Sequence, residues 1–129
     1  MAFMLLIVEP RGQRASRSPE EARLRYDEML AFGKDLQERG LLKASESLRT
    51  DEHAVRVSHA GDKLHQPPQQ PSQQLQLRDG PFAEAKEMVG GFYLIDVATR
   101  DEAVAIAGRC PAARWSTVEV RECAPCYVV

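Results

Sequence analysis

Apolar residues fill every position of residues 3–8, FMLLIV. An uninterrupted apolar run of this length predicts a strand that is covered on both faces, and therefore a central strand. After the loop RGQRAS comes Ser18-Pro19-Glu20-Glu21, which combines an N-cap serine, a proline at the first helical position and a glutamate at the third. We therefore expect a helix that begins at Ser18.

This helix is expected to end at Gly40, because glycine is the usual residue just past a helix end. Its buried face is predicted from residues that recur at intervals of three and four: Ala22, Tyr26, Met29, Gly33 and Leu36. Leu30 and Phe32 flank this stripe. Leu24 lies on the opposite face, where an exposed leucine gives a faint indication of a partner.

The next two predicted strands form a hairpin. Residues 54–59, AVRVSH, alternate so that Val55 and Val57 share one face, and residues 75–79, LQLRD, form the return strand. Residues 61–74 are rich in proline and glutamine, which supply neither ladder donors nor much apolar burial. We expect them to form a flexible loop.

The last three predicted elements are a strand, a helix and a strand. Residues 88–97 read as an apolar strand in which Gly90 and Gly91 indicate a bulge or a close backbone approach. A capping box at residues 99–102 starts a second helix that Pro111 ends, and residues 116–122, STVEVRE, form the last strand. This order predicts an α+β fold of the ferredoxin-like type, with two helices on one face of a mostly antiparallel sheet.

The helices are expected to cover the valines of the alternating strands, Val55, Val57, Val118 and Val120. The opposite face would then combine the large apolar residues of the central strands with these polar residues: Arg56, Ser58, Glu119 and Arg121. So large an apolar patch is unusual on a monomer. We therefore expect a homodimer of the α+β barrel type, in which a second copy covers this face and encloses a pocket. The alternative is that the charged edge stays solvated.

Composition limits the class of protein. The 129 residues are 43% hydrophobic and 28% charged with a net charge of −2, which favours one domain over residues 1–129 and offers no field for nucleic acid. The start MAFMLLIVEP lacks the features of a signal peptide and is too short to span a bilayer. Three cysteines without a framework spacing favour the cytoplasm. We expect neither nucleic-acid nor membrane binding.

Several segments together resemble the YCII-related, DGPF-domain family. They are MAFMLLIVEP, GLLKASESL, RDGPFAEAKEMVGGFYLIDV, AGRCPAA and TVEVREC, which together extend over nearly the whole chain. The resemblance implies a small cytoplasmic dimer of ferredoxin-like, α+β barrel type, with a cleft between sheet and helices and no assigned activity. It also implies genes that often lie near those of sigma factors. Some relatives use a His-Asp pair in the cleft, but the first helix of this chain contains no histidine, so such a dyad is not transferred.

The segment Asp79-Gly80-Pro81-Phe82 is the main candidate site. In a structural interpretation Asp79 caps the turn, Gly80 supplies an unusual dihedral, Pro81 fixes the next one and Phe82 fills the core. In a functional interpretation Asp79 faces a pocket, and Glu84 is a second acid or base. Asp79 and Glu84 are then the catalytic candidates. The ligand-binding candidates are Arg56, Gly80, Pro81, Phe82, Lys86, Glu119 and Arg121.

Arg56, Glu119 and Arg121 occupy like-facing strand positions. Two arginines near one carboxylate would bind an anionic small molecule in an enclosed site. They would equally form an exposed ion-pair network, because alternation does not tell whether the strands are neighbours.

Cysteine and histidine give little further chemistry. Cys123 and Cys126 are spaced as C-x-x-C but lie in the last seven residues, where a helix that would activate a thiol is not expected. The three histidines, His53, His59 and His65, lack carboxylates at ligand spacing. We predict no metal site and no cofactor.

The sequence therefore favours a homodimer whose cleft binds a small polar or anionic molecule, with acid–base chemistry by Asp79 or Glu84. The alternative is a non-catalytic interaction module linked to transcription, for which Leu24 and the loop at 61–74 would supply the docking surface.

Overall fold

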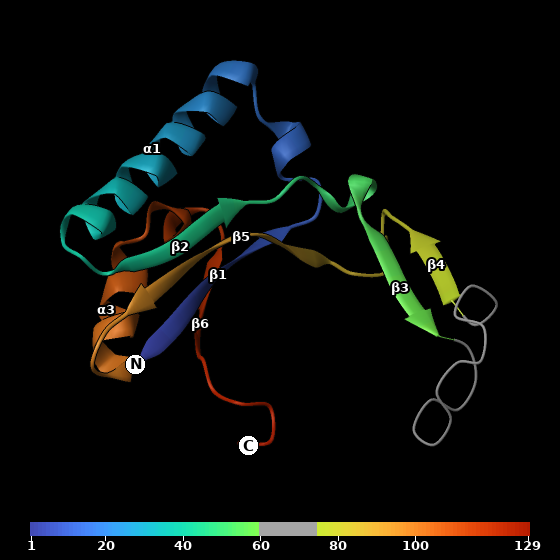
Figure 1. Cartoon of the computed structure of the whole chain (residues 1–129). Helices are drawn as coiled ribbons and strands as arrows, with labels where there is room; N and C mark the ends of the chain where they lie inside the picture. Colours follow the sequence, from blue (N-terminus) through green and yellow to red (C-terminus); the bar gives the residue numbers. More distant parts are fainter. Residues whose placement is uncertain (60–74) are drawn as a thin grey trace. The chain divides into compact units, whose positions relative to one another are not determined.

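The computed structural model describes residues 1–59 and 75–129, so the loop predicted over residues 61–74 lies outside the described residues. Figure 1 shows the elements along the chain. The strands are β1 (Ala2–Pro10), β2 (Leu42–Ser47), β3 (Val55–His59), β4 (Leu75–Asp79), β5 (Glu87–Asp96) and β6 (Thr117–Glu122). The helices are α1 (Pro19–Glu38) and α3 (Arg100–Arg109), with short 3₁₀ turns η1 (Arg14–Ser16), η2 (Asp51–His53) and η3 (Pro111–Arg114).

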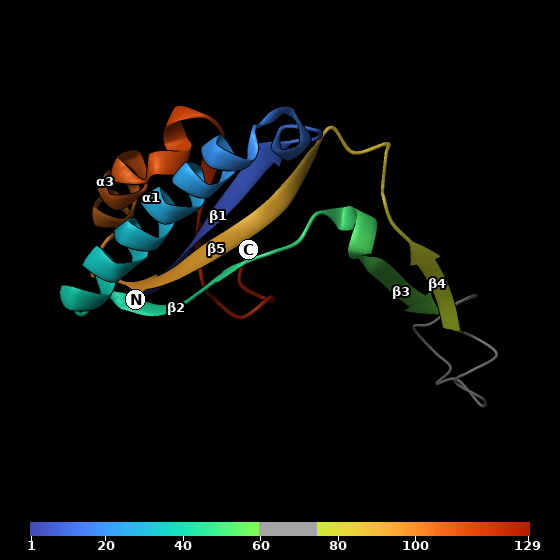
Figure 2. The same ribbon diagram turned by 90° about the horizontal axis from the view of Figure 1, so that it is seen from above.

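The chain divides into two compact units, which we call the main unit and the hairpin unit. The main unit consists of Met1–Leu48 and Lys86–Val129, and the hairpin unit is Arg49–Ala85. The main unit contains a four-stranded sheet with the order β2-β5-β1-β6, in which every neighbouring pair is antiparallel. Both helices cover one face of this sheet (Figure 2). The predicted ferredoxin-like α+β fold is confirmed.

One strand of this sheet was not expected. β2 lies at the sheet edge and pairs with β5, although Lys43, Ser45 and Glu46 are poor strand formers. It joins the sheet because it follows α1 directly and the backbone of β5 offers it a free edge. The tertiary pairing therefore overrides the weak local preference.

The predicted hairpin forms a separate two-stranded sheet, β3-β4, in the hairpin unit. Val55 and Val57 are 51% and 59% exposed, so the expectation that the helices cover them is wrong. The cause of this error is the strand β2, which was not predicted. It occupies a position in the main sheet where the hairpin strands were expected. Val118 and Val120 do pack against the main core, as expected.

The main core lies between the helices and the sheet. Phe3, Leu5 and Ile7 alternate along β1 toward the helices and are buried, whereas Met4 and Leu6 on the other face are only half-buried. The expectation of a central strand is confirmed, because β1 lies between β5 and β6. Its far face is less covered than its apolar sequence predicts.

The two predicted helix starts carry the predicted caps. The Ser18 hydroxyl accepts a hydrogen bond from the Glu21 N–H at 3.1 Å, and the Thr99 hydroxyl accepts one from the Glu102 N–H at 3.2 Å. Gly40 has a φ of +72°, the left-handed conformation in which a helix commonly ends.

The buried stripe predicted for α1 holds in its second half only. Gly33 and Leu36 are buried and Met29 is half-buried, but Ala22 is exposed and Tyr26 is 46% exposed. Gly33 allows the helix to approach the Tyr93 ring, since a Cβ at this position would lie 3.2 Å from a ring carbon. Toward its start the helix instead borders a hollow.

We predict that Leu36→Ala lowers the free energy of unfolding by about 2–5 kcal/mol, because the fully buried side chain would leave a cavity. Leu24→Ala is the matched control on the same helix, and since Leu24 is 55% exposed its effect should stay within about 0.5 kcal/mol. Denaturant titration measures both values. Equal losses in the two variants would contradict the packing of α1 described above.

Candidate functional site

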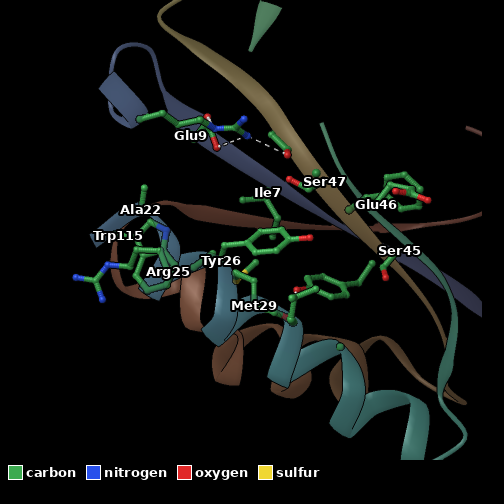
Figure 3. Close-up of a pocket in the computed structure, with 18 of the residues that line it drawn as sticks. Ile7, Glu9, Ala22, Arg25, Tyr26, Met29, Ser45, Glu46, Ser47 and Trp115 are labelled. Atoms are coloured by element: carbon green, nitrogen blue, oxygen red, sulfur yellow. Dashed lines mark hydrogen bonds and ion pairs between the residues drawn. The ribbon is translucent and has the colours of Figure 1, made fainter. Parts of the chain in front are cut away.

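The main unit contains a pocket of about 490 Å³ between α1 and the sheet. Its walls come from β1, α1, β2 and β5, and from the segment around η3. Figure 3 shows Arg25 and Trp115 near one end, Tyr26 in the middle and Ser45 at the other end. The pocket lies on the helix side of the sheet, in the place that the resemblance implied for a cleft.

A buried ion pair lies beside this pocket. Glu9 continues the inward row of Phe3, Leu5 and Ile7 and is only 6% exposed. The turn η1 brings Arg14 back toward it, so that Arg14 Nε lies 2.7 Å from Glu9 Oε1, in ion-pair contact without hydrogen-bond alignment. A second guanidinium nitrogen donates to Glu9 Oε2 at 3.2 Å. A buried carboxylate requires such a partner.

Arg14 also fixes the backbone around the pocket. Its guanidinium donates to the carbonyl of Leu48 at 2.7 Å and to that of Gly90 at 3.1 Å. These bonds join the end of β2 and the start of β5 to the Glu9 carboxylate at the end of β1. The donors of Arg14 are therefore largely used within the protein, and we assign it a positioning role.

Gly90 is the extra residue of a β-bulge, because Ile7 pairs with Gly91 and Val8 pairs with Val89. A Cβ at Gly90 would overlap Glu9 Oε2 and lie 2.7 Å from an Arg14 nitrogen. The predicted bulge is thus confirmed at Gly90, and the predicted close backbone approach is confirmed at Gly91, where a Cβ would lie 2.8 Å from the Glu46 carbonyl oxygen. The glycine provides the space in which the ion pair forms.

Tyr93 supplies a neutral polar group to the wall. Its hydroxyl donates to the Met29 carbonyl at 2.7 Å, and its ring meets Phe32 edge to face with centroids 5.2 Å apart. Burial raises the pKa of the Tyr93 hydroxyl well above its ordinary value. The group therefore stays protonated, and its oxygen is available to accept a hydrogen bond from a ligand.

Trp115 carries three arginines around its indole. The guanidinium carbons of Arg25, Arg114 and Arg17 lie 4.7, 5.4 and 5.8 Å from the ring centroid. Arg25, Arg17 and Trp115 line the pocket. The whole lining carries four cations, Arg14, Arg17, Arg25 and Lys34, against the carboxylates Glu9 and Glu46. The pocket therefore favours a ligand with negative charge.

The DGPF segment lies in the hairpin unit, where it closes the base of the β3-β4 hairpin onto η2. The Gly80 N–H donates to the Ala54 carbonyl at 2.8 Å, and the Phe82 N–H donates to the Asp51 carboxylate at 3.2 Å. A Cβ at Gly80 would overlap the Asp51 carbonyl, so Gly80 is required for close approach. These contacts give the motif a structural role.

Two of the predicted ligand-binding residues contact each other beside this turn. Arg56 lies over the buried ring of Phe82, with its guanidinium carbon 3.7 Å from the centroid. Arg56 faces Arg78 across the hairpin, and both contact Glu84, at 3.7 Å and 2.6 Å. A hydrogen bond from its own backbone N–H, and then one from Arg78, lower the pKa of Glu84. A carboxylate held ionised in this way is poorly suited to general acid catalysis near neutral pH.

Two of the other predicted site residues, Glu119 and Arg121, belong to a different sheet from Arg56. Glu119 and Arg121 are on β6, whose neighbour is β1, whereas Arg56 is on β3, whose neighbour is β4. The three residues are thus not on neighbouring strands. Lys86 directly precedes β5, Pro81 is exposed in the turn, and Asp79 is exposed at the end of β4. The catalytic and ligand-binding roles of these residues stay predictions.

The sequence analysis missed the residues that form the pocket, chiefly Glu9, Arg14, Tyr26, Tyr93 and Trp115. One signal for Glu9 was present, because it has the same parity along its strand as Phe3, Leu5 and Ile7. A carboxylate in a buried row requires a cation, and Arg14 follows five residues later.

The described ranges 1–59 and 75–129 contain no group of three or more histidine, cysteine, aspartate or glutamate residues arranged to hold a metal ion. Within the same ranges no helix has the length and apolar character needed to cross a membrane.

Comparison with known proteins places this site in a wider context. The family model of the YCII-related domain matches residues 1–126. An uncharacterized protein of Rhizobium meliloti (strain 1021), R00369, is 61% identical over 31 residues, which are 24% of this chain and 25% of that protein, so the match spans about a quarter of the relative's length.

A solved structure has a similar fold. It is the 5-chloro-2-hydroxyhydroquinone dehydrochlorinase TftG from Burkholderia phenoliruptrix AC1100, in complex with 2,5-dihydroxybenzoquinone. The superposition has a TM-score of 0.51 with 12% identity, and it covers 96% of this chain and 94% of the other. At this identity the similarity shows the fold alone.

We predict that Arg78→Gln raises the pKa of Glu84 toward its ordinary value of 4.5, because it removes the second cause of the lowering. Arg56→Gln should raise it less, since Arg56 is the more distant cation. In the wild type the stabilisation from Glu84 is present above its ordinary pKa and is lost as the pH falls through the lowered one. Carboxyl NMR titration measures these values, and identical titrations in all three proteins would refute the pairing.

Proposed function

The chain belongs to the YCII-related family, and on this premise we propose that it is a small-molecule-binding protein whose polar or anionic ligand occupies the pocket between α1 and the sheet. The observation that carries the proposal is the pocket itself, about 490 Å³ in volume, in which apolar and aromatic side chains lie beside charged and polar ones. Ligand sites in proteins commonly have this size and composition.

Exposed apolar side chains around the opening support the proposal. Tyr26 and Leu30 line the pocket and are 46% and 53% exposed. Their positions on α1 place them on the helix side that faces the sheet, where apolar groups are normally covered. A ligand in the pocket would cover them and gain the free energy of that burial.

The lining supports binding more directly than acid–base catalysis. None of the described residues that line the pocket is a histidine, and the carboxylate of Glu9 is held by Arg14. Uncommitted hydroxyl groups are available from Tyr26, Ser45 and Ser47 to orient a ligand. Catalysis by Asp79 or Glu84 in the hairpin unit is a separate proposal, and the lowered pKa of Glu84 counts against a proton-donating role for it.

We also propose that the protein is a homodimer joined through the sheet face away from the helices. On this face Met4 opposes Leu94 and Leu6 opposes Phe92, and all four side chains are half-buried. The charged residues Glu119 and Arg121 of β6 border them. An apolar centre with a polar border is typical of a protein interface.

A second candidate function, a regulatory interaction module linked to transcription, is favoured by the hairpin unit. Val55, Val57 and Leu77 are between 51% and 64% exposed, and Val57 and Leu77 are direct cross-strand partners. A two-stranded hairpin is only marginally stable by itself, so a partner covering this face would stabilise it. Leu24 on α1 is a further exposed apolar residue.

We predict that Ala22→Trp abolishes ligand binding, because Ala22 lines the pocket and an indole there would fill it. Ala31→Trp is the control, since Ala31 is exposed on the same helix and does not line the pocket. The test is a thermal-shift screen with small aromatic compounds, among them benzoate, 2-naphthoate, their amides and 2,5-dihydroxybenzoquinone. A compound at about 100 times its Kd should stabilise the wild type and Ala31→Trp by about 2.7 kcal/mol.

The screen separates the two candidate functions. If no compound stabilises the wild type, or if Ala22→Trp responds as well as Ala31→Trp, binding in this pocket is excluded. The interaction module would then be the better explanation of the fold.

We predict that the wild type sediments at twice the mass of one chain and that Leu6→Lys sediments at the mass of one chain, because the lysine would place a charge in the apolar centre of the interface. Leu24→Lys is the control and should stay dimeric, since Leu24 is on the outer side of α1. Analytical ultracentrifugation measures the masses. A wild type that remains monomeric at high concentration would contradict the dimer.

A further inference from the structure

We infer that the ligand of the pocket is a small aromatic carboxylate whose carboxylate group is bound by Arg25 and Arg17 beside Trp115. The inference rests on the proposed function, because it names the class of molecule that the same pocket binds. Four observations carry it: the long ion-pair distances of Arg25, the charge around Trp115, the contrast with Arg14, and the apolar character of the neighbouring wall.

Arg25 has no close hydrogen-bond partner for its charged group. Its guanidinium nitrogens lie 3.7 Å from Glu21 and 3.6 Å from Glu28, beyond the 2.7–3.2 Å that is typical of N–H···O hydrogen bonds. Within residues 1–59 and 75–129, its buried Nε atom has no hydrogen-bond partner. The terminal nitrogens, on a side chain that is 29% exposed, are able to donate to a ligand oxygen.

The neighbouring carboxylate is also shared with another cation. Glu28 accepts a hydrogen bond from Arg114, whose guanidinium lies on the same indole. In the described part of the chain Arg17 donates to a neutral partner, the side-chain amide oxygen of Gln13 at 3.2 Å. Three guanidinium groups thus gather at Trp115 near only two carboxylates, Glu21 and Glu28. The excess positive charge favours an anion at this end of the pocket.

Stacking on Trp115 prepares Arg25 for this role. The guanidinium carbon lies 4.7 Å from the ring centroid, and such a contact limits the orientations of the planar group. The edge of an arginine fork matches a planar carboxylate with two parallel hydrogen bonds. Arg14 does not offer this edge, because its donors hold Glu9 and two backbone carbonyls.

The part of the pocket next to this cationic end is apolar and aromatic. Tyr26, Met29, Tyr93 and Ile7 line it, and Figure 3 shows Tyr26 between the Arg25 end and the Ser45 end. A flat hydrophobic body suits this wall, since aromatic rings pack well against aromatic and thioether side chains. A free phosphate or a flexible sugar phosphate would leave the wall uncovered.

The test compares acids with their neutral amides by isothermal titration calorimetry on the full chain. The matched pairs are benzoate with benzamide and 2-naphthoate with 2-naphthamide. In the wild type the acid should bind roughly tenfold more tightly than its amide, as expected for a hydrogen bond to a charged group. Arg25→Gln should weaken binding of the acid more than binding of the amide and so abolish this preference. Arg25→Lys, which keeps the charge but loses the fork, should retain part of it.

Arg23→Gln is the matched control, because Arg23 is 77% exposed on the same helix, pairs with Asp27 and does not line the pocket. It should keep the full preference for the acid. Thermal unfolding and Trp115 fluorescence verify that each variant is folded. If Arg25→Gln does not fold, Arg17→Gln takes its place in the comparison.

The possible failures are distinct. Equal binding of acid and amide by the wild type, or a preference that survives in Arg25→Gln, would overturn the carboxylate site and leave the proposed pocket function standing. Binding of neither acid nor amide would overturn both. Competition by millimolar inorganic phosphate as strong as that by benzoate would show a general anion site and would also overturn the inference.

Discussion

The architecture of the pocket depends on one buried ion pair. Glu9 is placed in the core by the alternation of β1, and a carboxylate in that position is tolerated only with a cation beside it. Arg14 provides the cation, and its guanidinium also donates hydrogen bonds to the carbonyls of Leu48 and Gly90. The bulge at Gly90 leaves the space for both side chains. The ion pair, the turn η1 and the bulge at Gly90 therefore hold the ends of β1, β2 and β5 together.

The position of α1 over the sheet follows from side-chain size. In the second half of the helix Gly33 contacts the Tyr93 ring, and the Tyr93 hydroxyl bonds the Met29 carbonyl, so the backbone is held close to β5. In the first half the contacts are made by long side chains, such as Arg25 on Trp115. The result is a helix that borders the pocket along much of its length, from Ala22 to Gln37, and packs closely on the core at Leu36. The exposure of Tyr26 follows from its position in the wall of this pocket.

Much of the fold could be predicted from the sequence because its signals are local. The caps at Ser18 and Thr99, the stop at Gly40 and the bulge glycine Gly90 each encode a backbone requirement within a few residues. β2 could not be predicted in this way, since its residues prefer other structures and only the free edge of β5 makes it a strand. Because β2 was not predicted, the hairpin was assigned to the main sheet, and Val55 and Val57 were wrongly expected to be buried.

The candidate site was harder to predict, because its residues come from distant segments and join only through the topology. The conspicuous motif Asp79-Gly80-Pro81-Phe82 attracted the functional interpretation, yet its contacts to Asp51 and Ala54 explain it as the closure of a hairpin. Trp115 and Arg25 are 90 positions apart, and neither carries a motif. A conspicuous motif therefore marks where the backbone is most constrained, whereas binding chemistry depends on which side chains keep unused donors after the fold has formed. In the main unit Arg25 is such a side chain, and Arg14, five residues from Glu9, is not.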